Sequence, residues 1–222
     1  MTRAHDRLLY LIRHGQTDWN VEPARCQGWA DVPLNEDGRE QARTQARTLA
    51  GRGIGLIVTS HLLRARQTAE IIRAELEARE RSNGAAVCPG PPEPDGVPLL
   101  VDERLAETRR GDWEGRRFSD IIRDDPQTWR RYREHPESFR FPGGESLAEH
   151  QRRVLAAVRD VAADGRTAAL VTHGGSIRLV RAFLEGGGIE TVHRMPVANG
   201  GIVEVPTAGL TERIEAFLSE PA

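Results

Sequence analysis

The sequence predicts an α/β fold, a three-layer α/β/α sandwich built on a mostly parallel central sheet. Short apolar runs of strand length recur along the chain, and longer segments with apolar residues at helical spacing alternate with them. Three of the predicted strands lead directly into polar side chains, at Arg13-His14, at Ser60 and at His173. Such placement is expected where parallel strands end at one edge of a sheet, because sites of α/β proteins form there.

The first part of the chain predicts two strands and two helices. Residues 8–12 and 54–60 are apolar runs that suit strands buried on both faces. A helix is expected over about 36–52, because Asn35 is a good N-cap and several alanines with Leu49 can form one buried face. A second helix is expected over 62–80 from its apolar residues at helical spacing.

The middle of the chain predicts a loop and a helical cap. Residues 82–98 contain five prolines and are expected to form a loop, followed by a short strand over 99–101. Residues 118–140 resemble two short polar helices interrupted at Pro126 and Pro136. We expect the segment of about 116–141 to be a cap or lid inserted in a single domain that spans residues 1–222.

The last third of the chain predicts a further alternation of helices and strands. Ser146 is the expected cap of a helix over 147–163, and a strand over 167–172 leads through Gly174 into a helix that ends near Leu184. Residues 201–205 are expected to form a strand. The pattern over 210–218 fits a helix or a strand equally well.

Composition narrows the class of protein. The net charge is −2, so neither nucleic acid nor a membrane is indicated as a partner, although all 31 basic residues are arginine. Cys26 and Cys88 form no Cys-x-x-Cys pair, so no zinc site and no structural disulfide is expected. The apolar run at the start is too short for a signal peptide or a membrane span, and we expect a cytoplasmic protein.

The strand ends predict a phosphate-binding site. Arg13, His14, Arg64 and His173 follow or lie near these ends, with Gly174 at a helix N-terminus. Guanidinium groups and exposed backbone amides bind phosphate, and a neutral imidazole can be a phosphoryl acceptor. The leaving oxygen needs a proton, so a carboxyl with a raised pKa is expected nearby. Glu107 and Glu114 are both candidates, and Glu114, which follows Trp113, could instead hold its loop through hydrogen bonds.

Six segments, in order, resemble the histidine phosphatase superfamily in its phosphoglycerate mutase-like branch. They include the Arg13-His14-Gly15 motif and the Thr172-His173-Gly174-Gly175 motif, and together they extend from about residue 8 to 205. The remaining four segments are 27–34, 60–69, 105–115 and 142–146.

The resemblance implies a phosphoglycerate mutase-like fold and a role for particular residues. His14 matches the phosphorylated nucleophile and Glu107 the general acid, with no metal and no other cofactor. Phosphate-pocket partners would be Arg13, Arg64 and His173. The substrate, a small phosphorylated metabolite, would be bound by Arg13, Asn20, Gln27, Gly28, Arg64 and Gly174.

Two positions depart from the family pattern. Ala106 stands where the family often has Arg, and His61 stands where it often has Asp. Neither position carries the core chemistry, so these departures bear on substrate contacts. Assembly as a homodimer is compatible with the sequence.

Three functions are consistent with these residues. The preferred one is a metal-independent phosphomonoester hydrolase acting through a phosphohistidine on His14. A cofactor-dependent phosphoglycerate mutase is the first alternative, disfavoured by the phosphatase-like Trp113-Glu114-Gly115 segment and by a C-terminal tail without basic residues. A non-catalytic phospho-ligand-binding protein is the second, disfavoured by the complete residue set.

Other candidate side chains are expected to be structural or to face solvent. Trp19 and Trp29 are expected near the site, where they can simply pack. Five histidines and six arginines have no site context, although one or two of these arginines could reach an acidic substrate. They are His5, His61, His135, His150 and His193, and Arg116, Arg117, Arg130, Arg131, Arg133 and Arg140.

Overall fold

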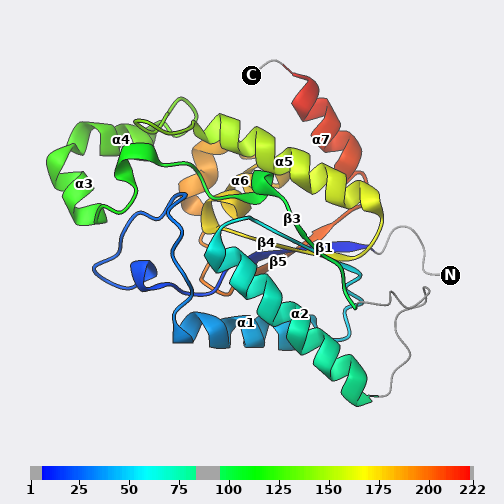
Figure 1. The fold of residues 1–222 in the computed structure, drawn as a ribbon. Coiled ribbons are helices and arrows are strands. Elements are labelled where there is room, and N and C mark those ends of the chain that lie inside the picture. Colours follow the sequence, from blue (N-terminus) through cyan, green and yellow to red (C-terminus); the bar gives the residue numbers. More distant parts are fainter. Residues whose placement is uncertain (1–6, 84–95, 221–222) are drawn as a thin grey trace.

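The computed structural model describes residues 7–83 and 96–220, and it has an α/β/α sandwich architecture (Figure 1). Its central sheet has five strands in the order β3-β2-β4-β1-β5. The pairs β1–β4, β4–β2 and β2–β3 are parallel, and β5 alone runs antiparallel, at the edge beside β1. The strands are β1 (Leu8–Arg13), β2 (Leu56–Thr59), β3 (Leu99–Val101), β4 (Ala168–Thr172) and β5 (Ile202–Pro206).

Side chains that point alternately to the two faces of the sheet form a hydrophobic core on each face. In β1, Tyr10 and Ile12 pack with α1 (Glu36–Leu49) and α2 (Leu63–Asn83). Leu9 and Leu11 point to the other face, which α5 (Leu147–Asp164), α6 (Gly174–Leu184) and α7 (Leu210–Ser219) cover. Because side chains alternate along a strand, an apolar run such as that of β1 requires helices on both faces.

A third apolar cluster lies at one end of the molecule, where α3 (Phe118–Asp124) and α4 (Pro126–Glu134) project beyond the sheet (Figure 1). Pro126 occupies the first turn of α4, and Asp125 caps that helix by accepting from Thr128 N. The cluster consists of Cys26, Trp113, Ile121, Tyr132, Phe139, Phe141, Leu147, Leu179 and Val192. Short 3₁₀ turns occur at Asp18–Asn20, Glu103–Leu105, Gly111–Trp113 and Ile189–Arg194.

The predicted helix caps are present. The Asn35 side chain accepts from Gly38 N at 2.9 Å, and Ser146 forms a reciprocal capping box with Glu149. Several boundaries differ from the sequence predictions: α1 ends at Leu49, three residues earlier than expected, and α2 continues to Asn83, into the predicted loop. Most of that loop, with Cys88, lies outside the described residues.

The ambiguous C-terminal segment is a helix. Leu210 and Ile214 of α7 are buried one turn apart, and Phe217 packs on Phe183 of α6 at 5.3 Å between ring centroids. This spacing of three to four residues matches one helical face and cannot be met by a strand. Within the described residues, no helix is both long enough and apolar enough to span a lipid bilayer.

Sheet register brings the predicted site residues together. Arg13 is paired with Thr172, and Thr59 with Val171, so β1, β2 and β4 end side by side. The backbone pairing continues one residue further, since His14 N donates to Thr172 O at 3.0 Å. His14 and His173 therefore follow the ends of two neighbouring strands, at the same edge of the sheet.

Candidate active site

His14 is held in one tautomer. Its Nδ1 lies 2.6 Å from the carbonyl oxygen of Gly15, and because a carbonyl can only accept, Nδ1 carries the proton. The side chain is buried, and this burial together with the nearby charges of Arg64 and Arg13 lowers its pKa well below the usual histidine value. A neutral ring with a protonated Nδ1 leaves the lone pair of Nε2 available as a nucleophile.

Two buried guanidinium groups flank His14, and each keeps its Nε without a partner among the described residues. Arg64 donates to the carbonyls of Ala30 at 2.8 Å and Gly28 at 2.7 Å, which fixes the group in place. Arg13 donates in the same way to Val197 O. Burial lowers the pKa of both guanidinium groups to about 10, so both stay charged at neutral pH.

His173 lies beside His14, with their ring centroids 5.1 Å apart. Its Nε2 is 2.9 Å from Ser60 Oγ, while its buried Nδ1 has no partner among the described residues. Burial and the charge of Arg64 lower the pKa of this imidazole well below its usual value. The unpaired Nε–H groups of Arg13 and Arg64 are donors that a bound anion would satisfy, and the unpaired Nδ1 of His173 lies near them.

Glu107 lines the same cavity from the segment after β3. Thr108 N donates to its Oε1 at 2.8 Å, and Gly175 N donates to its Oε2 at 3.1 Å. A Cβ on Gly175 would lie 2.0 Å from Oε1, so only glycine permits this approach to the N-terminus of α6. The carboxylate is therefore held between two backbone N–H groups.

The prediction of a raised pKa for Glu107 is wrong. Burial does raise the pKa of this carboxyl, but the Arg110 guanidinium and the Thr108 N–H more than offset it. The pKa consequently lies well below its ordinary value, and the carboxyl is ionised. Arg110 was not identified from the sequence, and its positive charge lowers the pKa of Glu107 and so opposes the effect of burial.

Glu114 holds the surrounding loops and does not line the cavity. Its Oε1 accepts from Trp29 N at 3.0 Å and from Arg110 N at 2.8 Å. Trp29 in turn donates from its indole Nε1 to Glu107 O at 2.7 Å. The structure thus places Glu107 in the cavity and gives Glu114 the loop-holding contacts expected from the sequence.

A buried chain of hydrogen bonds extends from Glu107 into the core. Ser176 Oγ donates to Ala106 O at 3.1 Å, so it accepts from His150 Nε2 at 2.9 Å. His150 Nδ1 then accepts the hydroxyl proton of Thr108 at 2.7 Å. The Thr108 oxygen, 3.3 Å from Glu107 Oε1, presents a lone pair that can accept from a protonated carboxyl.

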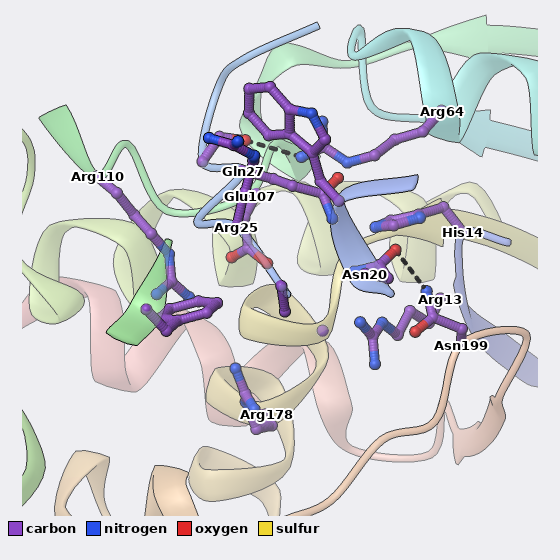
Figure 2. A pocket seen from close by; sticks show the side chains of 15 residues that line it. Arg13, His14, Asn20, Arg25, Gln27, Arg64, Glu107, Arg110, Arg178 and Asn199 are labelled. Atoms are coloured by element: carbon purple, nitrogen blue, oxygen red, sulfur yellow. Dashed lines mark hydrogen bonds between the residues drawn. The ribbon is translucent and has the colours of Figure 1, made fainter. Parts of the chain in front are cut away.

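The cavity that joins these groups has a volume of about 280 Å³ (Figure 2). Of the predicted site residues, Arg13, His14, Asn20, Gln27, Gly28, Arg64, Glu107 and Gly174 line it. His173 is completely buried and does not line it. Asn20 accepts from Asn199 Nδ2 at 3.0 Å, which ties the loop after β1 to the segment before β5.

Several lining residues were not identified from the sequence: Trp19, Ala24, Arg25, Arg110, Phe118, Arg178 and Asn199. Only Trp19 was expected near the site. Arg178 could have been found, because it lies four residues after Gly174 and so shares a face of α6 with it. Arg25, Arg110 and Asn199 reach the cavity through long-range folding that no local pattern reports.

Of the six arginines expected to face solvent, five are exposed and Arg116 is half-buried, and none of them lines the cavity. Arg116 pairs with Asp124 at 2.7 Å, and Arg140 pairs with Glu149. Of the other histidines, His135 is exposed, His61 packs against Trp29, and His193 bonds to Tyr132 O. His5 lies outside the described residues. His150 is buried, as expected of a structural histidine, and belongs to the chain that reaches Glu107.

Within residues 7–83 and 96–220, no group of three or more His, Cys, Asp or Glu side chains is arranged to hold a metal ion. The cations of the cavity are guanidinium groups. They are suited to planar oxyanions such as carboxylate and phosphate, which they bind by paired N–H donors.

Comparison with known proteins agrees with this chemistry. The model of the histidine phosphatase superfamily (branch 1) matches residues 9–83 and 92–218. Over 169 residues the chain is 37% identical to a protein of Enterobacter sp. named probable phosphoglycerate mutase, covering 75% of this chain and 69% of that protein.

Solved structures with the same fold include a phosphatase. The mycobacterial glucosyl-3-phosphoglycerate phosphatase with VO3 superimposes with a TM-score of 0.71 at 32% identity, covering 89% of this chain and 92% of that one. Bacillus stearothermophilus YhfR superimposes with a TM-score of 0.75 at 30% identity, covering 89% and 90%. Since the matched ranges include every strand of the sheet and both histidine motifs, the chain belongs to the histidine phosphatase superfamily (branch 1).

Proposed function

We propose that this protein is a metal-independent phosphomonoesterase that acts on a small phosphorylated metabolite. The phosphoryl group passes first to His14 Nε2 and then to water. The observation that carries this proposal is the hydrogen bond from His14 Nδ1 to Gly15 O, which leaves Nε2 unprotonated beside two buried guanidinium groups.

In the first step, a bond forms between His14 Nε2 and phosphorus as the bond from phosphorus to the leaving oxygen breaks. The unpaired Nε groups of Arg13 and Arg64, which both line the cavity, supply donors for the phosphoryl oxygens. In the second step, water attacks phosphorus and the nitrogen–phosphorus bond breaks, which releases inorganic phosphate and restores neutral His14.

Glu107 moves the proton in both steps. The pKa of its carboxyl lies well below the ordinary value, but a phosphate dianion bound nearby raises this pKa and favours uptake of a proton. The proton then passes to the leaving oxygen, and the carboxylate takes a proton from the attacking water. The Thr108 oxygen, 3.3 Å away, supports the protonated form by accepting from it.

The charges that a metal ion would provide to phosphoryl transfer are supplied here by arginine. Arg13 and Arg64 are buried, charged at neutral pH and fixed by backbone carbonyls before substrate arrives. Preorganised charge of this kind stabilises a phosphoryl transition state without reorganisation during the reaction. We therefore expect activity on an aryl phosphate to be unchanged by EDTA.

The test is to trap the intermediate. Mixing the protein with excess para-nitrophenyl phosphate and denaturing it in base should give a phosphoryl adduct that acid removes, as expected of phosphohistidine. His14→Ala should lose the adduct and at least about a thousandfold of the turnover. His135→Ala, at an exposed histidine, is the matched control and should behave as the wild type. An adduct that persists in His14→Ala would contradict the proposal.

A phosphoglycerate mutase is the alternative that the Enterobacter relative suggests. The two activities differ in what accepts the phosphoryl group from His14, since a mutase returns it to a second hydroxyl. Supplying phosphoglycerate and following phosphorus by NMR separates them. Inorganic phosphate as the main product supports the phosphatase, and an isomerised ester supports the mutase. Binding without either product would indicate a phospho-ligand-binding protein.

A further inference from the structure

The cavity carries more positive charge than one phosphoryl group needs. Among the described residues, five guanidinium groups line it, and Glu107 provides the only lining carboxylate. A bound phosphoryl group contributes about two negative charges. Arg13 and Arg64 flank His14 and are sufficient to bind that group, whereas Arg110 and Arg178 enter the cavity from the side away from His14 (Figure 2).

Arg110 is a buried cation that packs against two aromatic rings, and the carboxylate of Glu107 acts on it without forming an ion pair. Its guanidinium lies 5.3 Å from the centroid of the Phe141 ring and 5.9 Å from that of Tyr132, and only 8% of the residue is exposed. These rings hold the group against the cavity without neutralising it. Among the described residues, no Asp or Glu oxygen lies within 4.0 Å of the Arg110 guanidinium, the distance that defines an ion pair.

Arg178 reaches the cavity from α6. It lies one turn after Gly174, and helical side chains lean toward the N-terminus of their helix, so it points toward the cavity end of α6. Its Nε is buried without a partner among the described residues. Arg178 also contributes, after burial, to lowering the pKa of Arg13, which shows that the two charges repel each other.

We infer that Arg110 and Arg178 form a second anion site, which binds a carboxylate or a second phosphoryl group of the same substrate molecule. This inference rests on the proposed function, because it takes His14 as the place where the first phosphoryl group binds. The substrate class is therefore a phosphomonoester with a further negative group, and a phosphorylated neutral alcohol would be a poor ligand.

Protonation of Glu107 strengthens the need for that second group. The ionised carboxylate of Glu107 interacts favourably with Arg13, Arg64 and Arg110. When Glu107 takes up its proton to act as the acid, Arg110 loses this counter-charge. An anionic group on the substrate replaces it at the moment when it is lost, so the second site favours the catalytic state of Glu107.

Stable analogues test the second site without turnover. Calorimetry of the wild-type protein should show phosphonopropionate binding at least about tenfold more tightly than propylphosphonate, as expected for a charge-assisted contact. Both compounds have the same length and differ only at the end away from phosphorus. A series of phosphonocarboxylates with longer and shorter carbon chains identifies the best distance between the two anionic groups. Binding of propane diphosphonate then distinguishes a site for a phosphoryl group from a site for a carboxylate.

Substitutions test whether Arg110 and Arg178 form the second anion site. Arg178→Gln should bring the affinity ratio of the two analogues close to one, and Arg178→Lys should restore part of it. Arg110→Met should act in the same direction if it folds, and Arg178→Gln suffices if it does not. Arg181→Gln lies on the same helix, where Arg181 pairs with Glu185, and should keep the wild-type ratio.

Equal affinities for charged and neutral analogues at every chain length, or no binding of either, would overturn the second site. A ratio that survives in Arg178→Gln would do the same. These outcomes are independent of the phosphohistidine test. A trapped intermediate without discrimination between analogues removes only the second site, and discrimination without an intermediate removes only the proposed reaction.

Discussion

Thr108 Oγ1 lies 2.7 Å from Nδ1 of His150, and this contact connects the acid of the site to the core. Because Ser176 must donate to Ala106 O, the direction of each bond in the chain is determined as far as Thr108. All three side chains are almost completely buried. A change at Thr108 therefore affects both the stability of the core and the surroundings of Glu107.

Thr108→Val should lower the free energy of unfolding by about 1–3 kcal/mol, because it leaves the buried Nδ1 of His150 without a donor. Thr108→Ser keeps the hydroxyl and should recover most of the loss. Denaturant titration measures both, and Thr48→Val, at an exposed position of α1, controls for the substitution itself. Equal stability of the valine and serine variants would show that the hydrogen bond contributes nothing.

Stability should fall as the pH is lowered from 7 to 5. Burial lowers the pKa of His14, His150 and His173 in the folded protein, so the unfolded chain binds protons more readily than the folded one below about pH 6.5. Each histidine then costs about 1.4 kcal/mol of stability per pH unit, until the pH reaches its folded-state pKa.

Denaturant titrations across this pH range measure the effect. His150→Gln should remove about a quarter to a third of the slope, provided that it folds, because the lowered pKa of His193 adds a smaller contribution of the same sign. Glu107 also has a lowered pKa, but its contribution is fully present above about pH 4.5 and is lost only below it, so it does not alter the slope between pH 7 and 5. A flat profile over that range would show that these histidines are not held neutral.

Glu107→Gln should impair alkyl phosphates more than aryl phosphates. An alkoxide leaving group needs the proton, so we expect a loss of about 10² to 10⁴ in kcat/KM, whereas para-nitrophenolate leaves without help. Glu114→Gln is the matched control, because Glu114 accepts from Trp29 N and Arg110 N outside the cavity. It should reduce thermal stability and keep the ratio of the two activities. Equal losses on both substrates in Glu107→Gln would argue against an acid.

Gly38→Ala should destabilise the protein although alanine is the better helix former. A Cβ on Gly38 of α1 would lie 2.1 Å from the carbonyl oxygen of Gln16, a backbone atom that cannot move away cheaply. We expect a loss of about 1–3 kcal/mol, as for an overpacked core. Gly55→Ala, whose Cβ would meet only the Arg166 side chain at 3.4 Å, should change stability by less than about 0.5 kcal/mol. A neutral Gly38→Ala would mean that the two segments can separate.

Most of the fold could be predicted because its signals are local. The strands at Leu8–Arg13 and Ala168–Thr172 are apolar runs, and the caps Asn35 and Ser146 act within three residues of themselves. Helix ends were less accurate, since α1 ends at Leu49 and α2 continues to Asn83. These ends depend on packing against other elements, which local sequence does not record.

Some features of the candidate site could also be predicted from the sequence, and others could not. His14 and His173 follow strands, and parallel register brings them together, so their proximity could be inferred. The pKa of Glu107 could not, because it depends on Arg110 and on the N–H groups of Thr108 and Gly175. Arg110 faces the cavity through its packing on Phe141, a residue 31 positions away in the chain.

The carbonyl of Gly15 also determines which chemical isomer can form. Phosphohistidine exists as two regioisomers, one for each ring nitrogen, and they are different compounds with different antibodies and different phosphorus spectra. With Nδ1 occupied by its bond to Gly15, only the Nε2-linked isomer can arise on His14. An isomer-specific reagent would therefore report the orientation of the imidazole ring as well as the presence of the phosphoryl group.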